Sequence, residues 1–304
     1  MNTLDAMLAP TLDCAGRVLV FDRPRIAGIV NVTPDSFSDG GLYADTAHAV
    51  EHGLQLAAEG ADMLDVGGES TRPGAADVPV EEELRRVVPV IEQLARQTTL
   101  PIAVDTYKPE VMRAAVAAGA GMVNDVYALR RDGALDVVAS LGVAVCLMHM
   151  QGEPRGMQAA PHYDDVVGEV HRFLADRLLA CELAGIDRRK VMLDPGFGFG
   201  KDLEHNLALL RALERFADLG GGVYVGLSRK SMLGELTGRK VPVERVAAST
   251  AVALIAVQRG ARLVRVHDVA ATVDVLAVWR SVHAGDAAPV RDARPPAPRW
   301  PDDD

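Results

Sequence analysis

The stretch IAVDTYKPEVMRAAVAAGAGMV, residues 102–123, contains the pattern on which the fold prediction rests. Its short apolar run, Ile102–Val104, is followed by polar residues and then by Pro109–Ala118, where apolar side chains recur at helical spacing. Gly119 comes next, as is common where a helix ends, and a second apolar run begins at Met122. Runs that are apolar on both faces suit parallel strands covered by helices, so the stretch predicts one strand–helix unit and the start of another.

This unit repeats between about Arg25 and Val282. Eight such units over about 260 residues match a (β/α)8 TIM barrel, an α/β fold, in number and size. An open, doubly wound sheet is the alternative, but no glycine-rich nucleotide fingerprint follows the first run. The eight apolar runs are Ile26–Val32, Met63–Val66, Ile102–Val104, Met122–Val123, Ala144–Met148, Val191–Leu193, Val223–Leu227 and Leu263–Val266.

Two flanking segments do not share this pattern. Near the start, two short runs surround the turn residues Ala15 and Gly16 and predict a β-hairpin lying across one end of the barrel. From Gly285 onward, five of the 17 prolines and no apolar periodicity predict a disordered tail. We therefore expect an N-terminal extension with a hairpin over residues 1–22, a barrel over 23–284 and a disordered tail over 285–304.

Composition excludes several classes of protein. Of the 304 residues, 49% are hydrophobic, which excludes a disordered chain. Lys and Arg total 32 and Asp and Glu total 42, and the resulting charge of −10 argues against non-specific binding to nucleic acid. Three scattered cysteines give no disulfide framework, which indicates a reducing compartment. With no recognisable signal peptide and no apolar run long enough to span a bilayer, we expect a cytoplasmic protein without a membrane partner.

The active site of such a barrel forms where the strands end, so the polar residues just past the apolar runs are the candidate site. Asp105, Asn124 and Asp194 offer acceptors, and the two carboxylates are expected to stay ionised beside cations. A nitrogen-rich ring would satisfy these acceptors, and an anion would fit the donors. The donors suited to phosphate or carboxylate are Arg72, Lys230, Arg265 and His267.

Three shorter motifs fail on their context. The pattern His48-Ala-Val-Glu51-His52 fits a zinc site, but both histidines are expected to face solvent. Residues 196–201, GFGFGK, have one residue too few for a phosphate loop, and no Ser or Thr follows the lysine. Residues 226–230, GLSRK, begin like a nucleophile elbow but lack its final glycine.

Two longer motifs resemble the dihydropteroate synthases. Residues 31–41, NVTPDSFSDGG, resemble the first-loop signature of that family, and residues 65–74, DVGGESTRPG, resemble the second. The resemblance covers roughly residues 12 to 282. The remaining blocks follow in the family's order: VDT at 104–106, NDV at 124–126, LDPGFGFGK at 193–201, SRKS at 228–231 and VRVHDV at 264–269.

The resemblance implies an enzyme that joins 6-hydroxymethyl-7,8-dihydropterin pyrophosphate to 4-aminobenzoate and releases pyrophosphate, on the pathway to folate. It implies a dissociative mechanism, in which Asp35 supports a pterin-methyl cation, and a homodimer formed through the barrel helices. It also implies that Mg²⁺ binds at Asn31, and that sulfonamides compete with 4-aminobenzoate.

The resemblance also assigns roles to single residues. Catalytic roles fall to Asp35, Lys230 and Asp105. The pterin is bound by Asp105, Asn124, Met148, Asp194, Lys230 and Arg265. The pyrophosphate is bound by Asn31, Thr71, Arg72, Arg265 and His267. The 4-aminobenzoate is bound by Phe37, Ser38, Pro73, Phe199, Lys230 and Ser231, the last of which is expected to open a helix.

Two alternative functions remain open at this point. Lys230, near a strand end of a barrel, is compatible with a Schiff-base aldolase, which would need its lysine pKa lowered. A non-catalytic pterin-binding paralogue or a folate-binding methyltransferase module would share the ring-binding acids. Such a protein need not keep Asp35, Phe37 or Ser231, and their presence favours catalysis.

Overall fold

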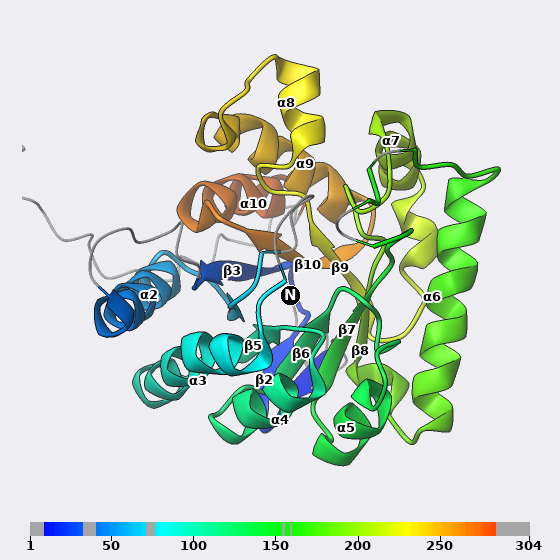
Figure 1. Cartoon of the computed structure of the whole chain (residues 1–304). Coiled ribbons are helices and arrows are strands. Elements are labelled where there is room, and N and C mark those ends of the chain that lie inside the picture. Colours follow the sequence, from blue (N-terminus) through cyan, green and yellow to red (C-terminus); the bar gives the residue numbers. More distant parts are fainter. Residues whose placement is uncertain (1–8, 33–40, 71–76, 154–155, 159, 284–304) are drawn as a thin grey trace, which may run out of the picture.

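The computed structural model is a closed eight-stranded barrel surrounded by helices, as predicted (Figure 1). It describes residues 9–32, 41–70, 77–153, 156–158 and 160–283. All neighbouring strands of the barrel are parallel, in the order β10-β3-β4-β5-β6-β7-β8-β9. The alternative of an open, doubly wound sheet is therefore wrong.

All eight apolar runs form strands, and helices connect them. The barrel strands are β3 (Arg25–Asn31), β4 (Met63–Gly67), β5 (Ile102–Asp105), β6 (Met122–Asp125), β7 (Ala144–Met148), β8 (Val191–Asp194), β9 (Gly222–Gly226) and β10 (Ala261–Val266). The outer helices are α2 (Gly41–Ala58), α3 (Val80–Gln97), α4 (Pro109–Ala117), α5 (Ala134–Leu141), α6 (Val166–Leu183), α7 (Leu203–Arg211), α9 (Val246–Gln258) and α10 (Val269–His283). The additional helix α8 (Ser231–Thr237) follows β9, and the single turns are η2 (Arg188–Lys190), η3 (Leu213–Phe216) and η4 (Pro242–Arg245).

The strands bury both faces because helices cover the barrel from outside and side chains fill it from inside. Val30, Val66, Val104 and Leu193 belong to the shell between strands and helices. The interior layer is a separate cluster that includes Met63, Met122, Cys146 and Met192. A filled interior leaves only the ends of the barrel for ligands.

A hairpin closes the amino-terminal end of the barrel. Strands β1 (Thr11–Cys14) and β2 (Arg17–Val20) pair across the predicted turn, where Ala15 and Gly16 both have positive φ, 53° and 87°. Leu12 and Leu19 pack against the interior layer of the barrel. A β carbon at Gly121 would lie 2.2 Å from the carbonyl oxygen of Cys14, so the barrel admits the hairpin only with glycine there. Ligands must therefore bind at the opposite, carboxyl-terminal end of the strands.

The ends of the chain lie outside the described residues. The predicted tail over 285–304 and the first eight residues are among them, so the domain boundaries at residues 22 and 284 stay predictions. Among the described residues, no single helix has the length and apolar character needed to cross a membrane; only α8 with η4–α9, a pair bent by 74°, meets that test jointly.

Candidate active site

Four of the predicted pterin-binding residues lie side by side around the carboxyl end of the barrel. Asp105 ends β5 and lies beside Asn124 of β6 in the parallel ladder. Met148 ends β7 and lies beside Asp194, which ends β8. The register of the barrel thus brings two acceptors and one amide onto the same rim from three different strands. Met148 is buried against Val126, Met150 and Met157, which gives this rim an apolar wall.

Arg265 of β10 reaches across the barrel to two carboxylates. One guanidinium nitrogen, Nη2, lies 2.8 Å from Oδ2 of Asp105, and Nε donates to Oδ2 of Asp65. Asp65 is wholly buried in β4 and also accepts hydrogen bonds from Asn124 Nδ2 at 3.0 Å and from the Tyr224 hydroxyl at 3.1 Å. These contacts join three of the predicted pterin residues, Asp105, Asn124 and Arg265, into one network centred on Asp65.

Sequence reasoning assigned no role to Asp65 or Tyr224. Both residues lie within strands, at positions that face the barrel interior, whereas the polar residues expected to form the site come at or past the strand ends. A signal was present, because Asp65 is an acidic residue inside the apolar run Met63–Val66, where ionisable side chains are rare.

The predicted ionisation of the acceptors is wrong for Asp105. Burial raises the pKa of Asp105 to about 7; Arg265 opposes this shift, and the charge of Asp65 adds to it. Asp105 is therefore only about half ionised near neutral pH, not fully ionised as expected. Burial also raises the pKa of Asp194, against the opposing effects of Lys230 and of a 2.7 Å hydrogen bond from the amide of Gly196. A ligand that donates to these oxygens would restore their charge.

Lys230 follows β9, and its side chain contacts the loop that follows β8. Its Nζ donates to the carbonyl of Phe197 and lies 4.6 Å from the centroid of the Phe199 ring. Burial lowers the pKa of Lys230 to about 8, and Asp194 limits the shift. The ammonium thus faces Asp194 and Asp105, which are predicted to bind the pterin, and lies over Phe199 of the predicted 4-aminobenzoate pocket.

Ser231 opens helix α8, as predicted, with Lys230 as its N-cap. Ser231 also lines a cavity of about 540 Å³ together with Asn206, Met232 and Glu235. The position of Ser231 at the first turn of a helix beside this cavity fits a carboxylate ligand, because backbone N–H groups point outward there.

Lys201 and His149 fix the loop that carries Phe199. Lys201 is buried and its Nζ donates to the carbonyls of Gly196 at 2.9 Å and Phe199 at 3.0 Å. It also lies 3.0 Å from Nδ1 of His149. Burial, reinforced by Lys201, lowers the pKa of His149 to about 2, so the neutral ring accepts from the lysine. Lys201 therefore holds backbone rather than phosphate, a role that sequence reasoning did not predict.

The predicted pyrophosphate end lies on the side of β10 and β3. Asn31 ends β3 beside Gly67 of β4, and its side chain is partly exposed. His267 follows β10, with Nδ1 3.0 Å from the hydroxyl of Ser228. Arg229, in the left-handed region at φ 59°, forms an ion pair of 2.6 Å with Asp268. This ion pair connects the loop that carries Lys230 to the loop that carries His267.

Lys108, the N-cap of α4, contacts both ends of the second loop, at Glu69 and Val78, and also Glu83 of α3. Nζ of Lys108 lies 2.5 Å from Glu69 and 2.5 Å from Glu83, and donates to the carbonyl of Val78 at 2.7 Å. The remaining predicted residues lie outside the described residues, so the structure tests none of their roles. These residues are Asp35, Phe37 and Ser38 of the first loop and Thr71, Arg72 and Pro73 of the second.

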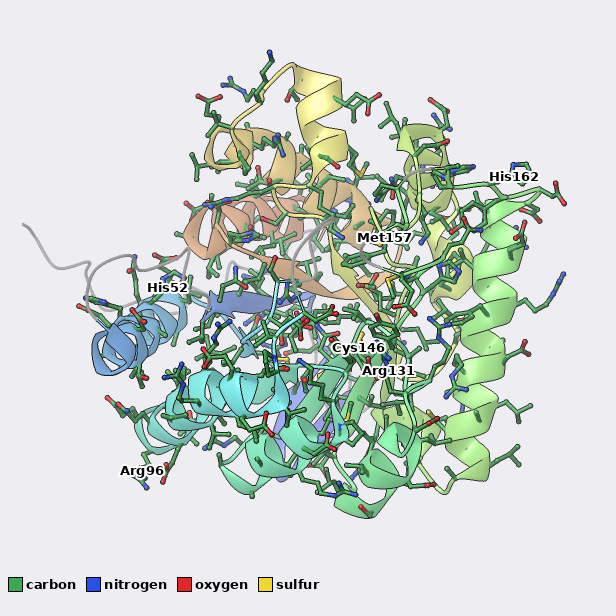
Figure 2. The ribbon with its side chains drawn as sticks, in the orientation of Figure 1. His52, Arg96, Arg131, Cys146, Met157 and His162 are labelled. Atoms are coloured by element: carbon green, nitrogen blue, oxygen red, sulfur yellow. The ribbon has the colours of Figure 1, made fainter. Side chains whose placement is uncertain are left out.

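The zinc-like motif finds no support. His48 is exposed and His52 partly exposed on α2, and Figure 2 shows His52 on the outside of the barrel. Within the described ranges no group of three or more His, Cys, Asp or Glu could hold a metal ion. Cys14, Cys146 and Cys181 are buried as free thiols, and Figure 2 shows Cys146 in the barrel interior.

Comparison with known proteins agrees with this geometry. The family model described as pterin binding enzyme matches residues 27–267, which include every rim residue named above. The chain belongs to the pterin-binding enzyme family. The chain is 51% identical over 263 residues to the dihydropteroate synthase of Escherichia coli strain K12, across 86% of this chain and 93% of that protein.

Solved structures of relatives have the same fold. The Xanthomonas albilineans dihydropteroate synthase with 4-aminobenzoic acid is 66% identical, with a TM-score of 0.87, over 91% of this chain and 99% of that one. The dihydropteroate synthase from the same organism in complex with 7,8-dihydropteroate is 64% identical, with a TM-score of 0.84, over 90% and 99% of the two chains.

Proposed function

We propose that this chain is a dihydropteroate synthase, which transfers the pterin-methyl group of 6-hydroxymethyl-7,8-dihydropterin pyrophosphate to 4-aminobenzoate. The observation that carries the proposal is the convergence of Asp105, Asn124, Asp194 and Lys230 on one rim of the barrel. Relatives at 51% and 64% identity are named for this activity or bind its product.

The rim chemistry supports a pterin-binding role for these residues. The amino-amidine edge of a pterin presents several N–H donors, and the carboxylates of Asp105 and Asp194 with the amide oxygen of Asn124 supply acceptors. The ammonium of Lys230 supplies a donor for the ring. Met148 and the guanidinium of Arg265 offer an apolar and a planar surface against which the ring faces can pack.

The reaction we propose is dissociative. The bond between the pterin-methyl carbon and the pyrophosphate oxygen breaks first, and both bonding electrons leave with the pyrophosphate. The amine nitrogen of 4-aminobenzoate then attacks the methyl carbon and loses one proton. Arg265 and His267 counter the charge of the leaving group, and Asp35, with its carboxylate, supports the cation. A closed site protects the cation from water.

A magnesium ion fits the donors on the pyrophosphate side. Asn31 offers a hard amide oxygen at the end of β3, and no acidic cluster surrounds it in the described part of the chain. Such a sparse donor set is typical of Mg²⁺ that keeps several waters and is bound largely through substrate phosphates. When bound, the ion would neutralise charge on the departing pyrophosphate.

The 4-aminobenzoate pocket that we propose lies between Phe199, Lys230 and Ser231. Its support is the ammonium above the Phe199 ring and the cavity of about 540 Å³ beside Ser231. Phe37, Ser38 and Pro73 would complete it from loops outside the described residues. We expect sulfonamides to bind here in competition with 4-aminobenzoate.

The assembly and location are further parts of the proposal. Ile255 on α9 and Val278 and Val282 on α10 are exposed apolar side chains on neighbouring helices. Burying them against a second copy would form a homodimer, which light scattering after size-exclusion chromatography would measure as twice the monomer mass. The three buried free thiols are compatible with the reducing cytoplasm.

One assay tests the activity. The purified chain, given pterin pyrophosphate, 4-aminobenzoate and Mg²⁺, should release pyrophosphate and form 7,8-dihydropteroate in equal amounts, and a sulfonamide should raise the apparent KM for 4-aminobenzoate. No dihydropteroate in the complete mixture would overturn the proposal. The aldolase hypothesis predicts instead a covalent adduct on Lys230 after borohydride treatment with a carbonyl substrate, and the alternative of a non-catalytic paralogue predicts pterin binding without product.

A further inference from the structure

Asp65 is the most buried carboxylate of the site. Its exposed fraction is 0%, and its Oδ2 accepts hydrogen bonds from Asn124, Tyr224 and Arg265, on three different strands. Its second oxygen, Oδ1, is buried and has no hydrogen-bond partner among the described residues. Oδ2 thus accepts three hydrogen bonds, whereas the buried Oδ1 accepts none from the described residues.

The fold alone does not need a carboxylate at this position. The neighbouring layer of the barrel interior is filled by Met63, Met122, Cys146 and Met192, whose side chains pack there without polar groups. An unsatisfied buried oxygen makes the folded state less stable than an apolar side chain of similar size would. Such a cost is typical of a group that has a task other than stability.

The three donors to Asp65 include two groups that reach the rim. Asn124 lies beside Asp105 in the ladder, and Arg265 donates to Asp105 through its other nitrogen at 2.8 Å. With Nε tied to Asp65, the plane of the guanidinium is fixed by two carboxylates on neighbouring strands, β4 and β5. The amide of Asn124 is likewise fixed, because its nitrogen donates to Asp65 and its oxygen is therefore free to face the ligand.

We propose that Asp65 is a positioning residue for the pterin: it orients the Arg265 guanidinium and the Asn124 amide so that both present the correct atoms to the ring. The proposal rests on the pterin-binding function proposed above and adds a residue beneath the rim. Asp65 acts through these two neighbours.

The charge of Asp65 gives the inference a second test, which is the pH dependence of pterin binding. The groups that face Asp65 or Asp105 are Arg265 on β10, Tyr224 on β9, Asp125 on β6, Cys146 on β7, Glu83 on α3, and Lys230, which follows β9. Asp194, which ends β8, faces Arg265 and Lys230. Removing the charge of Asp65 removes one of the carboxylates that raise the pKa of Asp105. The pH at which pterin binding strengthens should therefore fall.

The decisive variant is Asp65→Asn, measured with the full-length chain. We expect calorimetry with 6-hydroxymethylpterin to show affinity weakened about tenfold or more, because two oriented groups lose their common partner. KM for pterin pyrophosphate should rise while KM for 4-aminobenzoate stays unchanged. In an Arg265→Ala background the same substitution should weaken binding by less than about threefold, because one of the two side chains that Asp65 orients is already absent.

Two further variants separate positioning from a structural role. Cys146→Ala leaves a space in the apolar interior layer next to Asp65 without changing any charge, so it should lower the melting temperature and leave pterin affinity intact. Tyr224→Phe removes one donor from Asp65 and keeps its charge, so it should weaken affinity a few-fold and leave the pH midpoint in place. It also serves as the test variant should Asp65→Asn fail to fold.

Three results would overturn the inference: unchanged affinity in Asp65→Asn, equal losses with and without Arg265, or an equal loss in Cys146→Ala. If Asp65→Asn does not fold, unchanged affinity in Tyr224→Phe would overturn it instead. These outcomes are distinct from failure of the proposed function, which would show as no pterin binding and no dihydropteroate with the unsubstituted chain.

Discussion

Pterin binding should depend on pH through Asp105. Burial raises the pKa of Asp105 to about 7, so a fraction of the molecules carries a protonated Asp105 near neutral pH. A pterin edge that donates N–H groups needs the ionised form, because a protonated oxygen is itself a donor. Binding should therefore strengthen as the pH rises toward 7, and each binding event below that pH should release a proton.

The size of this effect follows from the pKa. A group with a pKa of about 7 is about one hundredth ionised at pH 5 and about half ionised at pH 7. Affinity should then rise by about 50-fold over this interval, which corresponds to about 2.3 kcal/mol. Above about pH 8 the trend should reverse as Lys230, whose pKa burial lowers to about 8, loses its charge.

Isothermal titration calorimetry with 6-hydroxymethylpterin would measure both quantities. This ligand carries no phosphate, so titration of the pyrophosphate does not contribute. Proton release is obtained by repeating the titration in buffers of different ionisation enthalpy. Asp105→Asn is the matched control: its binding should be weaker and should depend much less steeply on pH from 5 to 7, because only other buried carboxylates such as Asp194 still titrate. A pH profile that stays flat in the unsubstituted chain, or stays steep in Asp105→Asn, would refute the reasoning.

Three further outcomes are expected. Lys201→Met should lower the free energy of unfolding by about 3 kcal/mol, because two buried carbonyls lose their donor, and should raise KM for 4-aminobenzoate more than KM for the pterin. Thermal unfolding and steady-state kinetics would measure these effects, with Lys240→Met at an exposed position as the control. Equal effects on the two KM values would contradict the prediction. Asp35→Ala should keep calorimetric pterin binding and lose most turnover; lost binding would disprove its late role. Gly121→Ala should destabilise the chain by roughly 1–3 kcal/mol, since the added carbon meets the hairpin backbone; an unchanged melting temperature, with Gly156→Ala as control, would contradict this.

The barrel could be predicted from sequence because its signal is local. Each strand is a short apolar run, and each run is separated from the next by a helical stretch, so the fold follows from a repeat that needs no long-range information. The rim residues were found for the same reason, since Asp105 and Asp194 are the last residues of their strands.

The parts that sequence reasoning missed depend on the register of distant strands. Asp65 and Arg265 meet across 200 positions, and Lys201 meets His149 across 52, so neither contact has a local signature. The ionisation of Asp105 was mispredicted because it depends on how deeply the side chain is buried and on how Asp65 and Arg265 are arranged around it. Neighbouring cations were visible in the sequence, but the loss of solvent was not.

The hairpin that closes the amino-terminal end of the barrel has a consequence for the order in which the substrates bind. Because it seals one end, both proposed substrates must enter at the other end, where Asn124 and Asp194 are buried and Ser231 is exposed. An aminobenzoate molecule that arrived first would obstruct the pterin's path. The chain should therefore operate by compulsory order, with the pterin entering first, and steady-state inhibition patterns should be those of a sequential ordered enzyme.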